Sequence, residues 1–253
     1  MPPEPAATVQ VAHVMGLPVE IDLRDAGVPA GAAEAAFAEL RWVDAVFSTY
    51  RDDSEISRLA RGELRIADCC AEVDEVLTRC AELHDRTGGY FSVRPFGALD
   101  PSGLVKGWAV ARAAERLSEH GARNFLINAG GDVLARGRPE PGARWRVGIR
   151  HPTQHDALVA ALEVEDLAVA TSGLYERGAH IADPHRRGPA TGLRSVTVVG
   201  ADIATADAYA TAIFAMGEEG PAFAAGLTDL DVLCVTAGDE MLSTAGMERH
   251  RLR

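Results

Sequence analysis

Asp207 and Thr211 lie four residues apart in a stretch, 202–216, whose small and apolar residues predict a helix. On a helix, side chains four residues apart share one face and lie about one turn apart. A carboxylate and a hydroxyl in this arrangement, with a nearby backbone carbonyl, match the oxygen ligands that Mg²⁺ prefers, and phosphate oxygens and water usually complete its octahedron. The alternative is that Asp207 is a solvated helix residue and that Thr211 only fills space.

Lys106 belongs to the stretch 100–107, Asp-Pro-Ser-Gly-Leu-Val-Lys-Gly, which runs into a helical pattern over residues 108–117. A turn of proline, serine and glycine, followed by a lysine at the start of an amphipathic helix, offers free backbone N–H groups and a fixed cation to an anion. The stretch therefore predicts a phosphate site. The alternative for Lys106 is a lysine that extends along the helix surface to reach solvent.

Three further polar patches accompany predicted strands. In Asn128-Ala-Gly-Gly-Asp132, two adjacent glycines let the backbone approach a ligand closely, although the same residues also suit a tight hairpin turn. Thr171-Ser-Gly173 follows an apolar strand and is either a phosphate or hydroxyl contact or an ordinary strand exit. His180 and Asp183 could supply a general base and its orienting partner, but a lone histidine is more often a surface or packing residue.

Composition and missing motifs exclude several classes of protein. The net charge of −12 argues against a nucleic-acid binder and does not favour attachment to an anionic membrane surface. The sequence has no apolar run long enough to cross a membrane and no signal-peptide pattern at its N-terminus. It also lacks GxGxxG, GxxxxGK[ST] and GxSxG motifs, and its four cysteines have no zinc spacing.

The pattern of elements predicts a mixed fold. Strands are expected within 8–25 and at 124–128, 145–150, 157–164, 167–170, 195–199 and 231–236. Helices are expected at 30–46, after Ser54, and at 66–87, 108–120, 202–216 and 222–227. We therefore expect a single α+β domain over residues 1–253, with mixed sheets flanked by helices, two lobes enclosing one nucleotide site, and frayed tails at 1–7 and 248–253.

Taken in order, these motifs resemble those of the FAD:protein FMN transferase family, the ApbE-like flavin transferases. The resemblance covers about residues 15–217. It rests on six stretches: Phe47-Ser-Thr-Tyr-Arg-Asp-Asp-Ser-Glu-Ile-Ser-Arg-Leu59, Asp100-Pro-Ser-Gly-Leu-Val-Lys-Gly107, Asn128-Ala-Gly-Gly-Asp132, Ala170-Thr-Ser-Gly173 with Tyr175, His180-Ile-Ala-Asp-Pro184, and Ala206-Asp-Ala-Tyr-Ala-Thr-Ala-Ile-Phe214.

The resemblance implies a Mg²⁺-dependent enzyme that cleaves the pyrophosphate of FAD, moves FMN onto a Ser or Thr hydroxyl of an acceptor protein, and releases AMP. The implied metal ligands are Asp207, Thr211 and a backbone carbonyl near Gly103. His180 is the implied base, with Asp183 beside it. The implied FAD contacts are Tyr50, Ser54, Ser102, Lys106, Asn128, Gly130, Gly131, Asp132, Thr171 and Ser172. Since the lipoprotein signal of many relatives is absent, a cytoplasmic enzyme is expected.

The chain departs from the family pattern at Leu17, where a threonine is frequent, at Ser102, where a glycine is common, and at two turns. Ser92 follows Gly89-Tyr-Phe91 where an aspartate is frequent, and His185-Arg-Arg-Gly188 replaces a turn that is one residue shorter. These changes affect the expected FAD contacts and the recognition of the acceptor. Two alternatives stay open: a Mg²⁺-dependent FAD pyrophosphatase that yields FMN and AMP, and a non-catalytic flavin-binding or carrier protein.

Overall fold

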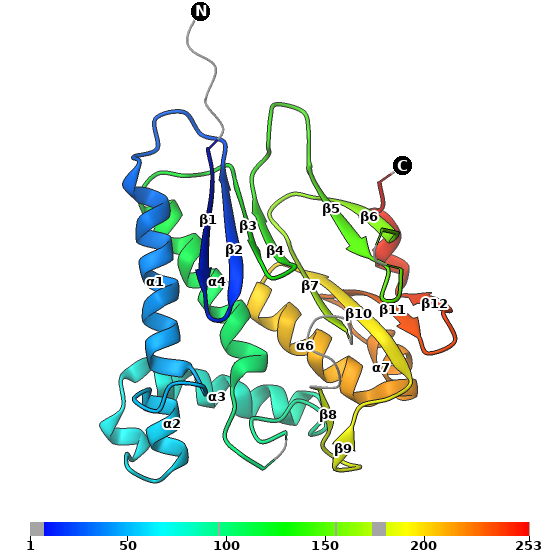
Figure 1. The fold of residues 1–253 in the computed structure, drawn as a ribbon. Coiled ribbons are helices and arrows are strands. Elements are labelled where there is room, and N and C mark those ends of the chain that lie inside the picture. The colour runs from blue at the N-terminus through cyan, green and yellow to red at the C-terminus, as the bar shows by residue number, and fades with distance from the viewer. Residues whose placement is uncertain (1–7, 96, 155, 174–180, 253) are drawn as a thin grey trace, which may run out of the picture.

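The computed structural model describes residues 8–95, 97–154, 156–173 and 181–252, and within these ranges it is built around an eight-stranded sheet (Figure 1). All neighbouring strands of this sheet are antiparallel. In spatial order the strands are β1 Thr8–Val14, β2 Leu17–Leu23, β3 Phe125–Ala129, β4 Asp132–Arg136, β7 Ala168–Gly173, β10 Leu193–Gly200, β11 Asp231–Thr236 and β12 Met241–Ser243. Two small hairpins complete the β-structure: β5 Trp145–Arg150 with β6 Leu158–Val164, and β8 Ala182–Asp183 with β9 Gly188–Pro189.

Helices pack on one face of the large sheet (Figure 1). They are α1 Gly31–Phe47, α2 Glu55–Ala60, α3 Ala71–Arg86, α4 Ser102–Glu119, α6 Ile203–Met216 and α7 Gly220–Ala224. Helix α6 is almost entirely buried, which agrees with a sequence that is apolar around its whole circumference. The separate helices and the antiparallel sheet together confirm the α+β class predicted from the sequence.

The large sheet has a hydrophobic cluster on each face. The first joins α1, α4 and α6 to inward residues of the sheet such as Ile21, Ile127 and Val196. The second lies on the opposite face, where Trp145 and Val147 of the β5–β6 hairpin pack with residues of β4, β7, β10 and β11. The hairpin therefore covers only part of this face, and the outward residues of β1 and β2 lie beside a cavity instead. Among the described residues, no helix is long and apolar enough to span a membrane.

The helix predicted at 66–87 is wrong at its start. A short 3-10 turn, Ile66–Asp68, comes first, and Cys70 is extended and N-caps α3. Glu55 Oε2 accepts a hydrogen bond from the Cys70 N–H at 2.7 Å, which satisfies a backbone group that a continuous helix would have used internally.

The C-terminal tail is also different from the prediction of a frayed end. The backbone of residues 250–252 pairs with β6: Glu163 N–H donates to the His250 carbonyl, and Leu252 N–H donates to the Ala161 carbonyl. His250 Nε2 lies 2.8 Å from a carboxylate oxygen of Asp231. These hydrogen bonds fix the C-terminal segment in place, since it pairs with the edge of β6 as an added strand would. The edge strand β12 also lies beyond 231–236, the last strand that the sequence predicts.

Candidate active site

A cavity of about 1600 Å³ opens between the uncovered part of the large sheet and the β5–β6 hairpin. Its other walls are the C-terminal end of α1, the loop around Phe91 and the first turns of α4. Pockets for drug-sized ligands are typically ~300–1,000 Å³, so this cavity has room for a larger ligand or for two partners. Most of the described residues that the sequence singles out line it: Tyr50, Ser102, Gly103, Lys106, Asn128, Gly130, Gly131, Thr171, Ser172, Asp207 and Thr211.

Lys106 is the centre of a buried charge cluster in the cavity wall. Its Nζ lies 2.7 Å from Asp132 Oδ2 and 3.6 Å from Asp207 Oδ1. Asp132 also accepts a hydrogen bond from the Thr171 N–H at 2.9 Å, and Asp207 accepts one from the Gly107 N–H at 3.1 Å. The lysine is therefore not a solvent-directed helix residue: it holds together α4, α6 and the start of β4.

This cluster has one more negative charge than positive charge when both carboxylates are ionised. Burial raises the pKa of Asp207 from its ordinary 3.8 to about 7, the charge of Asp132 acts in the same direction, and Lys106 and the Gly107 N–H oppose them. Within the described residues, buried Asp132 Oδ2 receives no hydrogen bond of normal geometry, although the lysine ammonium is close. A second cation at the cluster would therefore be favourable.

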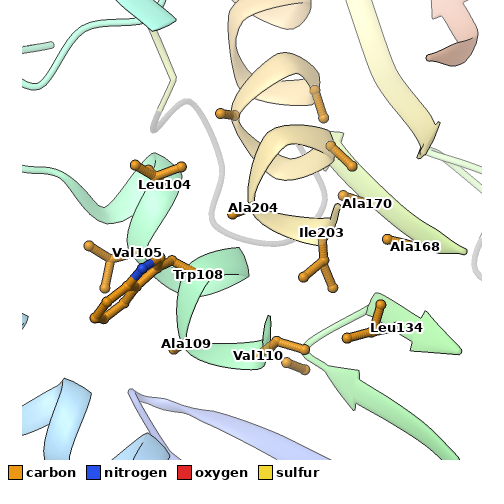
Figure 2. Packing of buried hydrophobic residues seen from close by; sticks show 14 of the residues in the cluster. Leu104, Val105, Trp108, Ala109, Val110, Leu134, Ala168, Ala170, Ile203 and Ala204 are labelled. Atoms are coloured by element: carbon orange, nitrogen blue, oxygen red, sulfur yellow. The ribbon is translucent and has the colours of Figure 1, made fainter. Parts of the chain in front are cut away.

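Helices α4 and α6 can bring these groups together because they approach closely at Gly107. Figure 2 shows the start of α6, with Ile203 and Ala204, beside the part of α4 that carries Leu104 and Trp108. A Cβ at Gly107 would lie 2.6 Å from the Ile203 carbonyl oxygen and 2.7 Å from Ala204 Cα. Only glycine therefore permits this approach without a shift of one helix. The close approach places the Gly107 N–H against the Asp207 carboxylate, one hundred residues away in sequence.

Thr211 follows Asp207 by one turn of α6, and its hydroxyl lies close to a second hydroxyl. Thr211 Oγ1 is 3.4 Å from Ser172 Oγ, and a Cβ on Gly103 would lie 3.7 Å from Thr211 Cγ2. The backbone at Gly103 and the Thr211 side chain are therefore neighbours, as the predicted metal site requires. The described residues contain no group of three or more His, Cys, Asp or Glu that could hold a metal ion. An ion here would bind one carboxylate, hydroxyl or carbonyl oxygens, and oxygens of the ligand or water.

The Asn128–Asp132 stretch is a hairpin turn that also faces the cavity. Asn128 Oδ1 accepts a hydrogen bond from the Gly131 N–H at 2.9 Å, and Gly130 and Gly131 both have positive φ. The predicted contact of Asp132 with a ligand is wrong in one respect: its side chain is 1% exposed and lies behind Lys106. Asp132 acts on the cavity through the lysine.

Ser54 is a second correction. It does not line the cavity, and it is fully buried as the N-cap of α2. Its hydroxyl donates to the Ser48 carbonyl at 2.7 Å and accepts from the Ser57 N–H at 3.1 Å. Ser54 therefore fixes the loop before α2, and this loop carries Tyr50, a largely exposed residue at the cavity rim.

The predicted catalytic pair is only partly described. His180 lies outside the described residues. Asp183 is buried and does not line the cavity: its Oδ1 accepts hydrogen bonds from the backbone N–H groups of His185 and Arg186. Its observed contacts shape the long turn, and its place beside His180 stays a prediction.

Two further parts of the site were not assigned to it from the sequence: the aromatic loop 88–97, which the sequence leaves open between a packed turn and a ligand contact, and β5, which was missed. Phe91 packs against Gly103, where a Cβ would lie 3.2 Å from the Phe91 ring. The His185 and Tyr90 rings are in contact with a tilted geometry, with 4.4 Å between their centroids. Every residue of β5 also lines the cavity. The aromatic residues of the 88–97 loop were a visible signal for the first part, whereas β5 showed only the alternation of an ordinary strand.

The α+β fold is shared with solved structures of ApbE proteins. The apbe protein of Thermotoga maritima superposes with a TM-score of 0.89 at 20% identity, over 98% of this chain and 100% of that chain. The flavin transferase ApbE of Vibrio cholerae gives a TM-score of 0.84 at 23% identity, over 96% of this chain and 98% of that chain. Similarity at this level of identity establishes a shared fold.

The chain belongs to the ApbE family, whose sequence profile matches residues 15–95 and 94–234. Curated relatives are named FAD:protein FMN transferase. The Rhodobacter capsulatus protein is 34% identical in an alignment of 190 residues, which covers 70% of this chain and 36% of the relative. The Vibrio cholerae protein is 33% identical in an alignment of 152 residues, which covers 56% of this chain and 46% of the relative. The matches span about half or less of the length of these two relatives.

Proposed function

We propose that this chain is a Mg²⁺-dependent FAD:protein FMN transferase, which attaches FMN to a Ser or Thr of an acceptor protein and releases AMP. The observation that carries the proposal is the buried cluster of Lys106, Asp132 and Asp207, which opens onto a large cavity beside Thr211 and Ser172. The family membership and the names of the curated relatives support the same activity.

The residues present fit a magnesium ion. Asp207 would supply a carboxylate oxygen, Thr211 a hydroxyl and Gly103 a backbone carbonyl, and the excess negative charge of the cluster favours a cation there. When bound, the ion would neutralise the pyrophosphate of FAD and stabilise charge that develops at the attacked phosphorus.

The chain's own residues supply the remaining positioning. Lys106 would hold a phosphate oxygen with its ammonium, since Asp132 fixes the side chain from behind. The Asn128–Asp132 turn would allow close approach of the flavin or its ribityl chain, because two glycines leave the backbone open. The His180 imidazole, with Asp183 near it in the chain, would accept the proton of the acceptor hydroxyl.

The proposed transfer exchanges one phosphorus–oxygen bond for another. The acceptor oxygen forms a bond to the phosphorus of the FMN half of FAD, and the bond from this phosphorus to the bridging oxygen breaks. AMP leaves with the bridging oxygen, and the hydroxyl proton goes to the base. If water replaces the acceptor hydroxyl, the same site acts as an FAD pyrophosphatase.

The test is to incubate the purified chain with FAD, Mg²⁺ and a candidate acceptor, and to measure AMP by chromatography and FMN addition by intact-mass spectrometry. Equal amounts of AMP and FMN-modified acceptor are expected. AMP without modified acceptor would assign the pyrophosphatase activity instead. Bound flavin without AMP under any metal would assign a flavin carrier and reject both enzymes.

We also propose the cytoplasm as the compartment. Four free cysteines, two of them buried, are compatible with a reducing environment. A cell fractionation experiment with a tagged copy would test the assignment.

A further inference from the structure

The β5 strand borders the cavity in a different way from the strands of the large sheet. Along β2, the lining residues after Leu17 are alternate ones, Pro18, Glu20 and Asp22, as expected for a strand that presents one face. Along β5, all six residues from Trp145 to Arg150 line the cavity. A strand whose consecutive residues all border a cavity presents its edge to that cavity.

The hydrogen bonds of β6 identify which backbone groups lie on this edge. Ala161 and Glu163 of β6 bond to the C-terminal segment, so their backbone groups point away from β5. In an antiparallel pair, both backbone groups of one residue point to the same neighbour and the direction alternates along the strand. The alternate β6 residues therefore bond to β5, and they are paired with Trp145, Val147 and Ile149.

Arg146 and Gly148 consequently direct their N–H and C=O groups away from β6 and toward the cavity. No other part of the described chain forms a backbone hydrogen bond with either residue. Figure 1 shows the C-terminal segment beside β6, on the side of the hairpin away from β5. Protein sheets usually protect a free edge, because it offers a template for another strand.

We propose that the free edge of β5 binds an extended segment of the acceptor protein by strand addition, a proposal that rests on the transferase function proposed above. The added strand would lie in the cavity between β5 and the outward face of β2 and β3. Six residues of β5 span about 20 Å and alternate donors with acceptors, which is the pattern of a peptide backbone. Because Lys106 and Thr211 line the same cavity, the acceptor hydroxyl and the pyrophosphate would share one enclosure.

Two observations favour β5 over β1, which is an edge strand of the large sheet. From β1, only Val11 lines the cavity, so a strand added there would lie mostly outside it. The β5 edge is also positively charged in a chain with a net charge of −12: Arg146 and Arg150 occupy exposed positions and both line the cavity. Arg146 is 3.6 Å from Glu163, and Arg150 has no ion pair with another described residue. We therefore expect an acidic residue in the acceptor segment.

The first test uses the wild-type chain with FAD, Mg²⁺ and a library of 12-residue peptides that carry one central threonine. FMN addition to peptides and AMP release are both measured. The best peptide is then remade with N-methyl groups on alternate backbone amides, in each of the two registers. We expect one register to lower kcat/KM about tenfold or more, since backbone hydrogen bonds to β5 are lost, and the other register to have a much smaller effect.

A second test changes the edge itself. Gly148→Pro removes one N–H from the β5 edge, and proline is tolerated at such positions because the N–H does not serve the ladder. Its control is Val9→Pro. The two-residue turn between Val14 and Leu17 makes the Val9 N–H point to the free edge of β1, outside the cavity. Gly148→Pro should raise KM for the peptide about tenfold while KM for FAD changes far less, and Val9→Pro should leave both unchanged.

The outcomes separate the two proposals. No AMP and no modified peptide with the wild-type chain would reject the proposed function. AMP without transfer to any peptide would assign the pyrophosphatase activity and reject the transferase function on which strand addition rests. Transfer to a peptide with equal effects of the two N-methyl registers would reject strand addition alone. If Gly148→Pro does not fold, as judged by circular dichroism, hydrogen exchange on the wild-type chain replaces it. Protection of the Arg146 and Gly148 amides by the peptide, and not by FAD alone, would support strand addition, and unchanged exchange would overturn it.

Discussion

At the residue scale, Asp207 is a buried carboxylate whose ionised form is poorly solvated, and it is the one carboxylate that the described residues bring to the proposed magnesium site. Its pKa of about 7, against an ordinary 3.8, means that the folded chain holds a proton that the unfolded chain releases. Folding stability should therefore decrease as the pH rises from about 4 to about 7, and the penalty should remain at higher pH.

Asp207→Asn should remove this penalty and the activity together. An amide oxygen can still accept from the Gly107 N–H, and Lys106 keeps Asp132 as its partner. At pH 8 without metal, we expect the variant to be more stable than the wild type by on the order of 2 kcal/mol. At pH 4 the difference should disappear. Urea unfolding at the two pH values measures this.

Mg²⁺-dependent AMP release should fall at least about 100-fold in the same variant, because the proposed metal ligand is lost. Asp156→Asn, at an exposed position, is the control and should change neither stability nor turnover. Unchanged AMP release by Asp207→Asn would refute its assignment as the ligand.

Lys106→Met tests whether the lysine serves the reaction or only the fold. The variant leaves two buried carboxylates without their cation, so stability should fall by about 3 kcal/mol and turnover by about 100-fold. Adding Asp132→Asn removes one of the two charges, and the amide oxygen can still accept from the Thr171 N–H. The double variant should regain stability but not turnover. Recovery of both would show that Lys106 has only a structural role.

At the scale of elements, the close approach of α4 and α6 decides whether the site forms. Gly107→Ala places a methyl group 2.6 Å from the Ile203 carbonyl oxygen, and the helices must separate to accept it. We expect a loss of about 2 kcal/mol in stability, together with a loss of turnover, because the Gly107 N–H moves away from Asp207.

Gly31→Ala is a matched control for this substitution. Gly31 is also a helical glycine, the first residue of α1. A Cβ there would meet no atom within 4 Å, and its φ is not positive. The control should be neutral or slightly stabilising in thermal unfolding. If Gly107→Ala behaved like Gly31→Ala in both assays, the close approach of the two helices would not be needed for the site.

At the scale of the whole molecule, we expect the proposed metal ion and FAD to stabilise each other's binding in the cavity. The described residues contain one carboxylate in the proposed metal site and no cluster of three strong ligands, so an ion should depend on phosphate oxygens to complete its shell. Millimolar Mg²⁺ alone should raise Tm only slightly, whereas Mg²⁺ with FAD should raise it by more than the sum of the separate effects.

Thermal shift measurements with each ligand alone, with both, and with EDTA added would check this coupling. In Asp207→Asn the additional shift should disappear, while the effect of FAD alone should remain. A full stabilisation by Mg²⁺ without FAD would contradict the shared site.

Much of the fold was predictable because the elements are specified by local patterns. The alternation on either side of Gly16 predicted the β1–β2 hairpin, and the apolar spacing of 202–216 predicted α6. The break before α3 was not predictable, because the Glu55 side chain satisfies the Cys70 N–H from fifteen residues away. The pairing of residues 250–252 with β6 was missed for the same reason: it depends on contacts distant in the sequence.

The sequence by itself determined which chemical groups the site contains: a carboxylate and a hydroxyl one helical turn apart, a lysine after a proline–serine–glycine turn, and a glycine hairpin. These groups depend on spacing along one element. Only the tertiary structure decided that Asp132 lies behind Lys106, that Ser54 caps a helix, and that β5 presents a free edge to the cavity. Burial, close helix approach and the choice of a strand partner are properties of residues far apart in the chain, so they become visible only once the chain is folded.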